Sequence, residues 1–297
     1  MIKIEQSPQR KPEWLKVKLI TTPNYSDMKN LMSKHTLNTV CEEARCPNIY
    51  ECWDNRTATV MILGDTCTRS CGFCSVKTGK PNNVDSDEPK RVADLVEKLS
   101  LRHVVVTSVD RDDLKDDYGS QIWHDTVIAI KEKNPDCTIE ILTPDFRGFK
   151  ASLDKVFDSL PDIFSHNIEC VERISRKVRP QSDWDRSLEV LKYSVESKML
   201  TKTGMMVGLG ESDEEVFHTM DLVREIGVEI FNIGQYLQPT QNHLTVKRYV
   251  DPEIFKLYKD YGKKIGFKVV ESGPLVRSSY HADKQARHYR KENKLSF

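Results

Sequence analysis

The sequence lacks several features that mark common protein classes. It has no apolar run of about 18 residues, the length that a membrane span needs, so no transmembrane helix is expected. Its first residues carry charges throughout and include no continuous apolar stretch, which argues against a secretory signal. Lys and Arg total 45 and Asp and Glu total 45, so no net charge favours nucleic-acid binding. We therefore expect a cytoplasmic protein that binds neither nucleic acid nor membranes.

The 297-residue chain has no internal repeat, but short runs rich in Val, Ile and Thr alternate with helical patterns. Each run is too short for a helix and is typical of a buried strand. The predicted strands are Thr59–Leu63, His103–Thr107, Thr138–Leu142, Ile163–Asn167, Lys202–Val207 and Glu229–Ile233. Apolar residues at helical spacing, such as Val92, Leu95, Val96 and Leu99, predict helices between them.

Two patterns mark helix starts. Ser212 and Glu215 form a capping box, and Asp251 before Pro252 is typical of an N-cap followed by proline at the first helical position. Strands that alternate with helices imply parallel pairing with right-handed crossovers. We predict an α/β fold, a partial (β/α)6 TIM-like barrel, because a closed barrel has more units. The barrel would cover residues 56–270, between an N-terminal extension (1–55) and a C-terminal segment with a polar tail (271–297).

Cysteine is the unusual component of the sequence. Six of the eight cysteines form two triplets, Cys41, Cys46 and Cys52 in CEEARCPNIYECW, and Cys67, Cys71 and Cys74 in DTCTRSCGFCSVKTG. Structural disulfides are rare in the cytosol, so clustered cysteines favour metal binding. Three thiolates on a compact loop suit three irons of a cubic iron–sulfur cluster and leave the fourth iron open. Zinc sites are the alternative, although zinc modules usually offer paired cysteines that complete four ligands.

The C-x3-C-x2-C spacing after a predicted strand resembles the radical S-adenosylmethionine (SAM) superfamily, and Phe73 matches the aromatic residue common there. With its flanking motifs, the chain resembles the lipoyl synthase family. These motifs are CEEARCPNIYECW, DTCTRSCGFCSVKTG, RDDL, HNIE, MVGLGE, GQYLQP and GPLVRSSYHAD, with KPEWLKVKL at residues 11–19. They spread over most of the chain.

The resemblance implies SAM and two four-iron, four-sulfur (4Fe-4S) clusters as cofactors. The second cysteine triplet would hold the cluster that reduces SAM and releases a 5′-deoxyadenosyl radical, so that the cofactor supplies the difficult chemistry. The first triplet would hold an auxiliary cluster. Its fourth ligand would be a serine of the RSSY motif, for which we predict Ser279, with Ser278 as the alternative.

The implied reaction inserts two sulfur atoms at C6 and C8 of an octanoyl chain on a carrier lysine, with the auxiliary cluster as sulfur donor. The implied partners are octanoylated lipoyl carrier domains or the glycine cleavage H protein, a reducing electron donor and an iron–sulfur cluster carrier. Another radical SAM enzyme with an auxiliary cluster is the alternative. An electron carrier or a zinc-stabilised nucleic-acid module is disfavoured, because the predicted barrel is large and the chain is neutral.

Residues at the ends of the predicted strands are candidates for SAM binding, because α/β barrels carry their sites at this rim. Asn167 and Glu169 could contact the ribose or the methionine of SAM. The alternatives are that Asn167 caps a loop and that Glu169 is a carboxylate at a helix start. Arg179 could pair with the methionine carboxylate, or could be a surface charge. Gly208 and Gly210 would allow close backbone approach to a ligand such as the adenine, or would form a tight turn.

Other charged residues have less specific interpretations. Arg111, Asp112 and Asp113 follow the second predicted strand, and we expect local ion pairs there rather than substrate contacts. Arg277 either binds the peptide around the modified lysine or fixes the RSSY loop.

Overall fold

The computed structural model describes residues 10–16, 22–34, 38–39, 48–54, 57–279 and 282. Within these residues the main sheet has eight strands in the order β1-β2-β5-β6-β7-β8-β9-β10. They are β1 (Asn38–Thr39), β2 (Thr57–Ile62), β5 (His103–Ser108), β6 (Thr138–Leu142), β7 (Ile163–Ser165), β8 (Thr201–Val207), β9 (Ile230–Gln235) and β10 (Val269–Gly273). Neighbouring strands pair in parallel, except that β1 is antiparallel to β2. A separate parallel pair joins β3 (Thr66–Cys67) to β4 (Lys77–Thr78).

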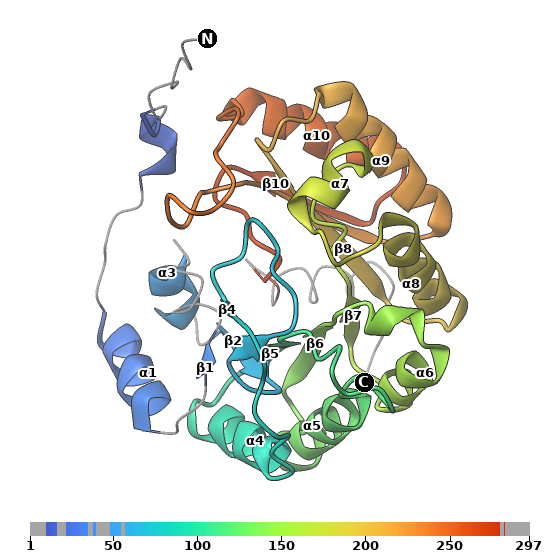
Figure 1. Ribbon diagram of the computed structural model, residues 1–297. Helices are drawn as coiled ribbons and strands as arrows, with labels where there is room; N and C mark the ends of the chain where they lie inside the picture. Colours follow the sequence, from blue (N-terminus) through green and yellow to red (C-terminus); the bar gives the residue numbers. More distant parts are fainter. Residues whose placement is uncertain are drawn as a thin grey trace.

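Helices α4, α5, α6, α8, α9 and α10 form an outer ring around these strands (Figure 1). Their bounds are Glu88–Lys98, Ser120–Lys133, Lys150–Asp158, Trp184–Glu196, Asp213–Ile226 and Pro252–Lys264. The remaining helical segments are η1 (Glu13–Leu15), α1 (Pro23–Lys34), α3 (Ile49–Asp54), η2 (Phe146–Gly148) and α7 (Glu172–Val178). In the part of the chain that the structure describes, β1 and β10 end the strand order without pairing with each other, so the barrel is open on one side there.

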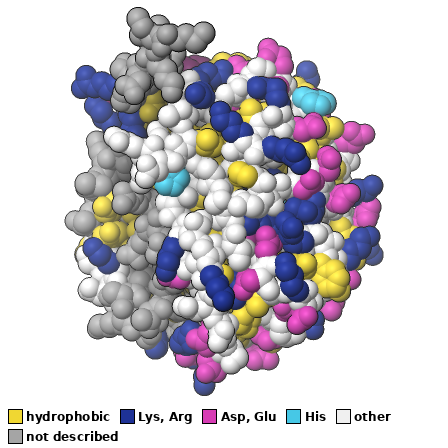
Figure 2. All heavy atoms as spheres, viewed as in Figure 1, with side chains coloured by type: hydrophobic (Ala, Val, Ile, Leu, Met, Phe, Trp, Pro, Cys, Tyr) yellow, Lys and Arg dark blue, Asp and Glu magenta, His cyan; other side chains and the backbone are white. Residues whose placement is uncertain are grey.

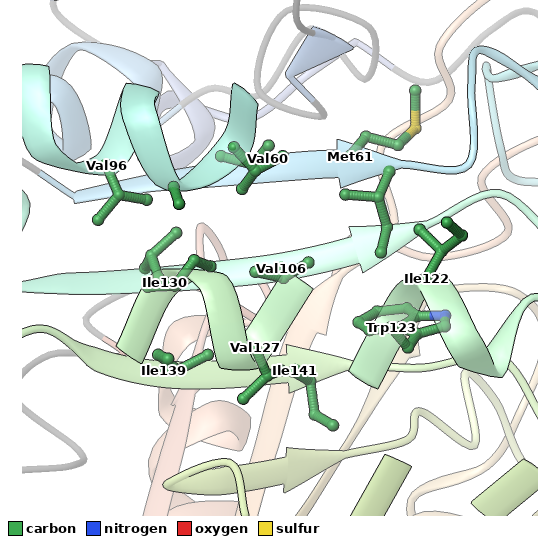
Figure 3. Close-up of a cluster of buried hydrophobic side chains, with 14 of the residues drawn as sticks. Val60, Met61, Val96, Val106, Ile122, Trp123, Val127, Ile130, Ile139 and Ile141 are labelled. Atoms are coloured by element: carbon green, nitrogen blue, oxygen red, sulfur yellow. The ribbon is translucent and has the colours of Figure 1, made fainter. Parts of the chain in front are cut away.

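An apolar core fixes the strands against the outer helices (Figure 3). Val60, Val106 and Ile141 come from β2, β5 and β6, and Val96 and Val127 come from α4 and α5, which cover them. All five side chains are fully buried. Burying one such side chain contributes about 1.5–3 kcal/mol, so this core fixes the strands and the loops at their ends.

The prediction of a partial TIM-like barrel is confirmed. Each predicted strand is present, and the parallel strand β10 is an addition that the sequence pattern did not predict. The predicted helix starts are also present. Ser212 and Glu215 form the capping box of α9, and Asp251 caps α10 with Pro252 at its start.

Charged residues of both signs cover the surface, and an ion pair between β8 and β6 lies inside the barrel. Figure 2 shows Lys and Arg interspersed with Asp and Glu on the visible face, which agrees with the formal net charge of zero. Inside the barrel, Lys202 of β8 and Glu140 of β6 are fully buried and form an ion pair with Nζ and Oε1 2.9 Å apart. Of the helices within the described residues, none combines the length and apolar character needed to cross a membrane.

Candidate active site

Cys67 is the last residue of β3, and Cys71 and Cys74 lie on the loop from β3 to β4, a segment that follows β2 in the chain. The Cys67 Sγ accepts the backbone N–H groups of Arg69 (3.4 Å) and Asp110 (3.3 Å). Burial, with the negative charge of Asp110 adding to it, raises the pKa of Cys67 to about 11 and that of Cys71 to about 12. Thiolates in such a place need a compensating positive charge, which a bound metal centre provides. Among the described residues, no three His, Cys, Asp or Glu side chains are placed to hold a single metal ion. The cluster role of the three thiols stays a prediction.

Two other segments hold the backbone of this cysteine loop. The N–H of Gly72 donates to the carbonyl of Val178 at the end of α7, and the N–H of Leu244 donates to the carbonyl of Gly72, both at 2.9 Å. A Cβ on Gly72 would lie 2.8 Å from Leu244 Cγ, so only glycine allows this close approach. His243 Nε2 donates to the carbonyl of Cys74 at 2.9 Å. The positions of the thiols are thus set by the loops that follow α7 and β9.

Arg69, between the first two cysteines of the loop, is buried among three carboxylates. Its Nε lies 2.8 Å from Asp112 Oδ2, its NH2 2.6 Å from Asp145 Oδ1, and its NH1 3.2 Å from Asp110 Oδ1. Asp145 also accepts from Arg186 Nε at 2.8 Å. Burial alone would raise the pKa of Asp145, but the hydrogen bond and charge of Arg69 lower it well below its usual value. Arg69, Asp110, Asp112 and Asp145, here named the Arg69 cluster, tie the cysteine loop to the ends of β5 and β6.

The local ion pairs predicted after the second strand are present in part. Arg111 NH2 lies 2.8 Å from Asp113 Oδ2, and the hydrogen bond from Arg111 lowers the pKa of Asp113. Asp112 instead belongs to the Arg69 cluster. Arg277 donates to the carbonyl of Val276 at 2.6 Å, a contact within its own loop.

The three side chains predicted to bind SAM lie together at the end of β7. Asn167 Nδ2 donates to Glu169 Oε1 at 3.2 Å. Glu169 has a left-handed φ of 65° and bridges to Met205 of β8, so it does not start a helix. Arg179 is only 5% exposed and donates to the carbonyl of Asn167 (3.1 Å) and to Ser187 Oγ (3.0 Å). The surface-charge alternative for Arg179 is therefore wrong.

Four buried polar atoms here lack a hydrogen-bond partner within the described residues: Ser165 Oγ, His166 Nε2, Asn167 Oδ1 and Arg179 Nε. His166 donates from Nδ1 to the carbonyl of Thr143 at 2.9 Å, so its Nε2 is an acceptor, and burial lowers its pKa to about 4. Buried polar groups are nearly always satisfied, so these atoms indicate a polar ligand. Two acceptors and a guanidinium donor fit the amine, hydroxyl and carboxylate groups of SAM.

Gly208 and Gly210 lie in the turn between β8 and α9. Gly208 has a φ of +96°, and a Cβ there would lie 2.2 Å from Gln235 Nε2 and 2.4 Å from the carbonyl oxygen of Arg248. The N–H groups of Gly208 (2.5 Å) and Gly210 (3.1 Å) donate to the carboxylate of Glu211. The tight-turn interpretation is therefore correct, and contact of either glycine with the adenine stays a prediction.

The structure describes three of the residues predicted for the auxiliary cluster: Cys52, Ser278 and Ser279. Cys41 and Cys46 lie outside the described residues. Cys52 on α3 packs against the core that Figure 3 shows in part. Ser278 and Ser279 are half-buried in a turn of the C-terminal segment.

Several residues that hold these segments were not predicted. Arg69 and Asp145 could have been found, because charged side chains beside strand ends are candidates in a barrel of this type. Asn48 donates from Nδ2 to the carbonyl of Leu275 at 2.7 Å, across 227 residues of sequence, and no local pattern indicates it. Asn232, in the middle of β9, is a further example.

Solved structures share this fold. SuiB of Streptococcus suis, crystallised with S-adenosylmethionine, aligns with a TM-score of 0.59 at 15% identity, over 79% of this chain and 56% of its own. Methylornithine synthase (PylB) aligns with a TM-score of 0.53 at 13% identity, over 92% of this chain and 93% of its own.

Sequence comparisons are more specific than these structural ones. The model of the radical SAM superfamily matches residues 61–223, and that of the N-terminal domain of lipoyl synthase of the radical SAM family matches residues 2–46. The lipoyl synthase of Flavobacterium johnsoniae is 53% identical over 95% of this chain and 98% of its own. The mitochondrial lipoyl synthase of Nematostella vectensis is 52% identical over 92% of this chain and 94% of its own. With this identity over almost the full length of both chains, the protein belongs to the lipoyl synthase family.

Proposed function

We propose how the residues of this chain divide the work of the reaction. The protein is a radical SAM sulfurtransferase that uses SAM and two 4Fe-4S clusters. When bound, one cluster and SAM supply the radical that removes hydrogen from C6 and C8 of a protein-bound octanoyl chain, and the auxiliary cluster supplies the two sulfur atoms.

In this proposal Cys67, Cys71 and Cys74 are the thiolate ligands of the SAM-cleaving cluster. The observation that carries the assignment is their place on one loop at the strand ends, tied to the Arg69 cluster and to the segments after α7 and β9. The two N–H groups that reach Cys67 Sγ stabilise its thiolate and fix its direction.

Asn167, Glu169 and Arg179 bind SAM in this proposal. The free Nε of Arg179 donates to the methionine carboxylate, and the carboxylate of Glu169 accepts from the amine. Asn167 Oδ1 accepts from a ribose hydroxyl or the amine. The backbone at Gly210 lies near the adenine, because a Cβ there would have only Lys247 within 4 Å, at 3.7 Å, whereas the space beside Gly208 is filled.

The auxiliary cluster is held by Cys41, Cys46, Cys52 and Ser279 in this proposal. A serine oxygen is a harder ligand than a thiolate and suits iron in this setting less well. Ser279 would therefore hold its iron less firmly than the three cysteines would hold theirs. The extension (1–55) and the C-terminal segment (271–297) accordingly serve the barrel (56–270) by bringing the sulfur source to it.

The substrates are lipoyl carrier proteins, either carrier domains or the glycine cleavage H protein, each with an octanoylated lysine. A reducing electron donor and an iron–sulfur cluster carrier complete the set of partners. We assign the enzyme to the cytoplasm, where free thiols such as those of Cys67, Cys71 and Cys74 persist.

The assignment is tested with anaerobically purified protein and an octanoyl-lysine peptide. Cys71→Ala should abolish SAM cleavage, whereas Cys46→Ala should spare cleavage and prevent sulfur insertion, as mass spectrometry of the peptide would detect. Lipoyl product from Cys46→Ala, or SAM cleavage by Cys71→Ala, would contradict the division of roles between the two triplets.

A further inference from the structure

Ser279 is carried by a segment, residues 275–279, that two buried asparagines hold: Asn48, just before α3, and Asn232, in β9. We propose that Asn48 and Asn232 are positioning residues that set the place of this segment, and hence of the serine ligand, relative to Cys52 and the barrel. The inference rests on the proposed role of Ser279 and extends it to residues that touch neither cluster nor substrate.

Asn48 joins the segment to the helix that carries Cys52. The Asn48 side chain is 5% exposed, and its Nδ2 donates to the carbonyl of Leu275 at 2.7 Å. The backbone carbonyl of Asn48 accepts the N–H of Cys52 at 2.9 Å, in the first turn of α3. One residue is thus bonded both to an auxiliary cysteine and to the serine-bearing segment.

Asn232 joins the same segment to the barrel. It is 2% exposed in the middle of β9, and its Nδ2 donates to the carbonyl of Ser278 at 3.0 Å, with that of Arg277 at 3.4 Å. Gly234 lies two residues further along the same face of the strand. A Cβ on Gly234 would lie 2.0 Å from the carbonyl oxygen of Val276, so the segment lies directly on β9.

Three carbonyls of the segment therefore meet fixed groups from two sides. The carbonyl of Leu275 meets Asn48, that of Val276 fits against Gly234, and that of Ser278 meets Asn232. A ligand bond that is weak and must break during the reaction contributes little to ordering its own loop, so preorganisation by surrounding hydrogen bonds has to supply that order. Such bonds also let the loop stay in place while the serine releases its iron.

The experiment compares iron retention in anaerobically purified holoenzymes. The variants are Asn48→Ala and Asn232→Ala, with the volume-matched Asn48→Leu and Asn232→Leu in case a cavity prevents folding. Asn134→Ala is the matched control, since Asn134 Nδ2 also donates to a backbone carbonyl, that of Ala93, at 3.1 Å between α5 and α4. Iron release to a chelator, EDTA, is followed together with the Mössbauer spectrum and with SAM cleavage.

We expect half of the iron to leave roughly tenfold faster in the Asn48 and Asn232 variants, as the loss of one buried hydrogen bond predicts. The Mössbauer signature of one cluster should change while SAM cleavage and the Asn134→Ala control remain normal. The positioning role is wrong if these variants match the parent protein in their rate of iron release and in their Mössbauer spectrum. In that case the cluster assignment still stands, provided that Cys52→Ala loses half of its iron. If Cys52→Ala keeps all its iron, the cluster assignment itself fails.

Discussion

Replacing Arg69 by Ala tests whether the Arg69 cluster holds the cysteine loop in place. Arg69 is 4% exposed, and its loss would leave the buried Asp145 with Arg186 as its remaining positive partner, and Asp110 and Asp112 without Arg69. Removing one partner of a buried ion pair costs about 3–5 kcal/mol. We expect a loss of this size in the free energy of unfolding, together with weaker retention of the SAM-cleaving cluster.

The assay is urea denaturation of anaerobically purified protein, with SAM cleavage measured in parallel. Arg69→Ala combined with Asp145→Asn should recover part of the lost stability, because one uncompensated carboxylate is removed. Arg173→Ala is the control, since Arg173 pairs with Glu215 at 2.6 Å on the surface, where such pairs contribute about 0–1 kcal/mol. A broken buried pair should cost far more than about 0.5 kcal/mol. The reasoning is refuted if the free energy of unfolding of Arg69→Ala lies within that margin of the control's and the variant keeps its iron.

Three further outcomes are expected. Lys202→Met should lower the free energy of unfolding by about 3–5 kcal/mol, and adding Glu140→Leu should restore most of it, as a double-mutant cycle in urea would measure. Burial lowers the pKa of His166 from 6.5 to about 4, so the unfolded state binds more protons between these values. The stability difference between the parent protein and His166→Gln should therefore fall by about 1.4 kcal/mol per unit as pH drops through this window. The comparison with the variant is needed because burial raises the pKa of Asp110 to about 6, which contributes the opposite slope. Gly208→Ala should lower Tm, because its Cβ would clash with Gln235 and Arg248; an unchanged Tm would contradict the tight turn.

The fold was predictable from the sequence because its determinants are local. Apolar runs and helical stripes predicted the strands, and capping residues predicted the starts of α9 and α10. Strand β10 was missed because Val269–Gly273 holds two apolar residues followed by polar ones. That strand is defined by its parallel register with β9, which the composition of the segment does not encode.

The candidate site was predictable only where it, too, depends on neighbouring residues. The spacing of the cysteines and their place after a predicted strand indicated the segment that carries Cys67. Both signals can be seen in a short stretch of sequence. The partners of that loop were not predictable, since Arg69 meets Asp145 from 76 residues away. The sequence left two interpretations of Arg179, a ligand contact and a surface charge. The choice between them depends on the packing of α7 against α8, which buries the side chain.

The hydrogen bond between Asn48 and Leu275 has a consequence for how the enzyme matures. Contacts between distant parts of a chain close late, after the intervening structure has formed. A nascent chain that has passed residue 244 already contains the Arg69 cluster and the contacts of the cysteine loop with Val178, His243 and Leu244, but it lacks the serine-bearing segment. We expect the SAM-cleaving centre to be complete before the sulfur-donating centre, which needs residues 275–279 to reach Asn48.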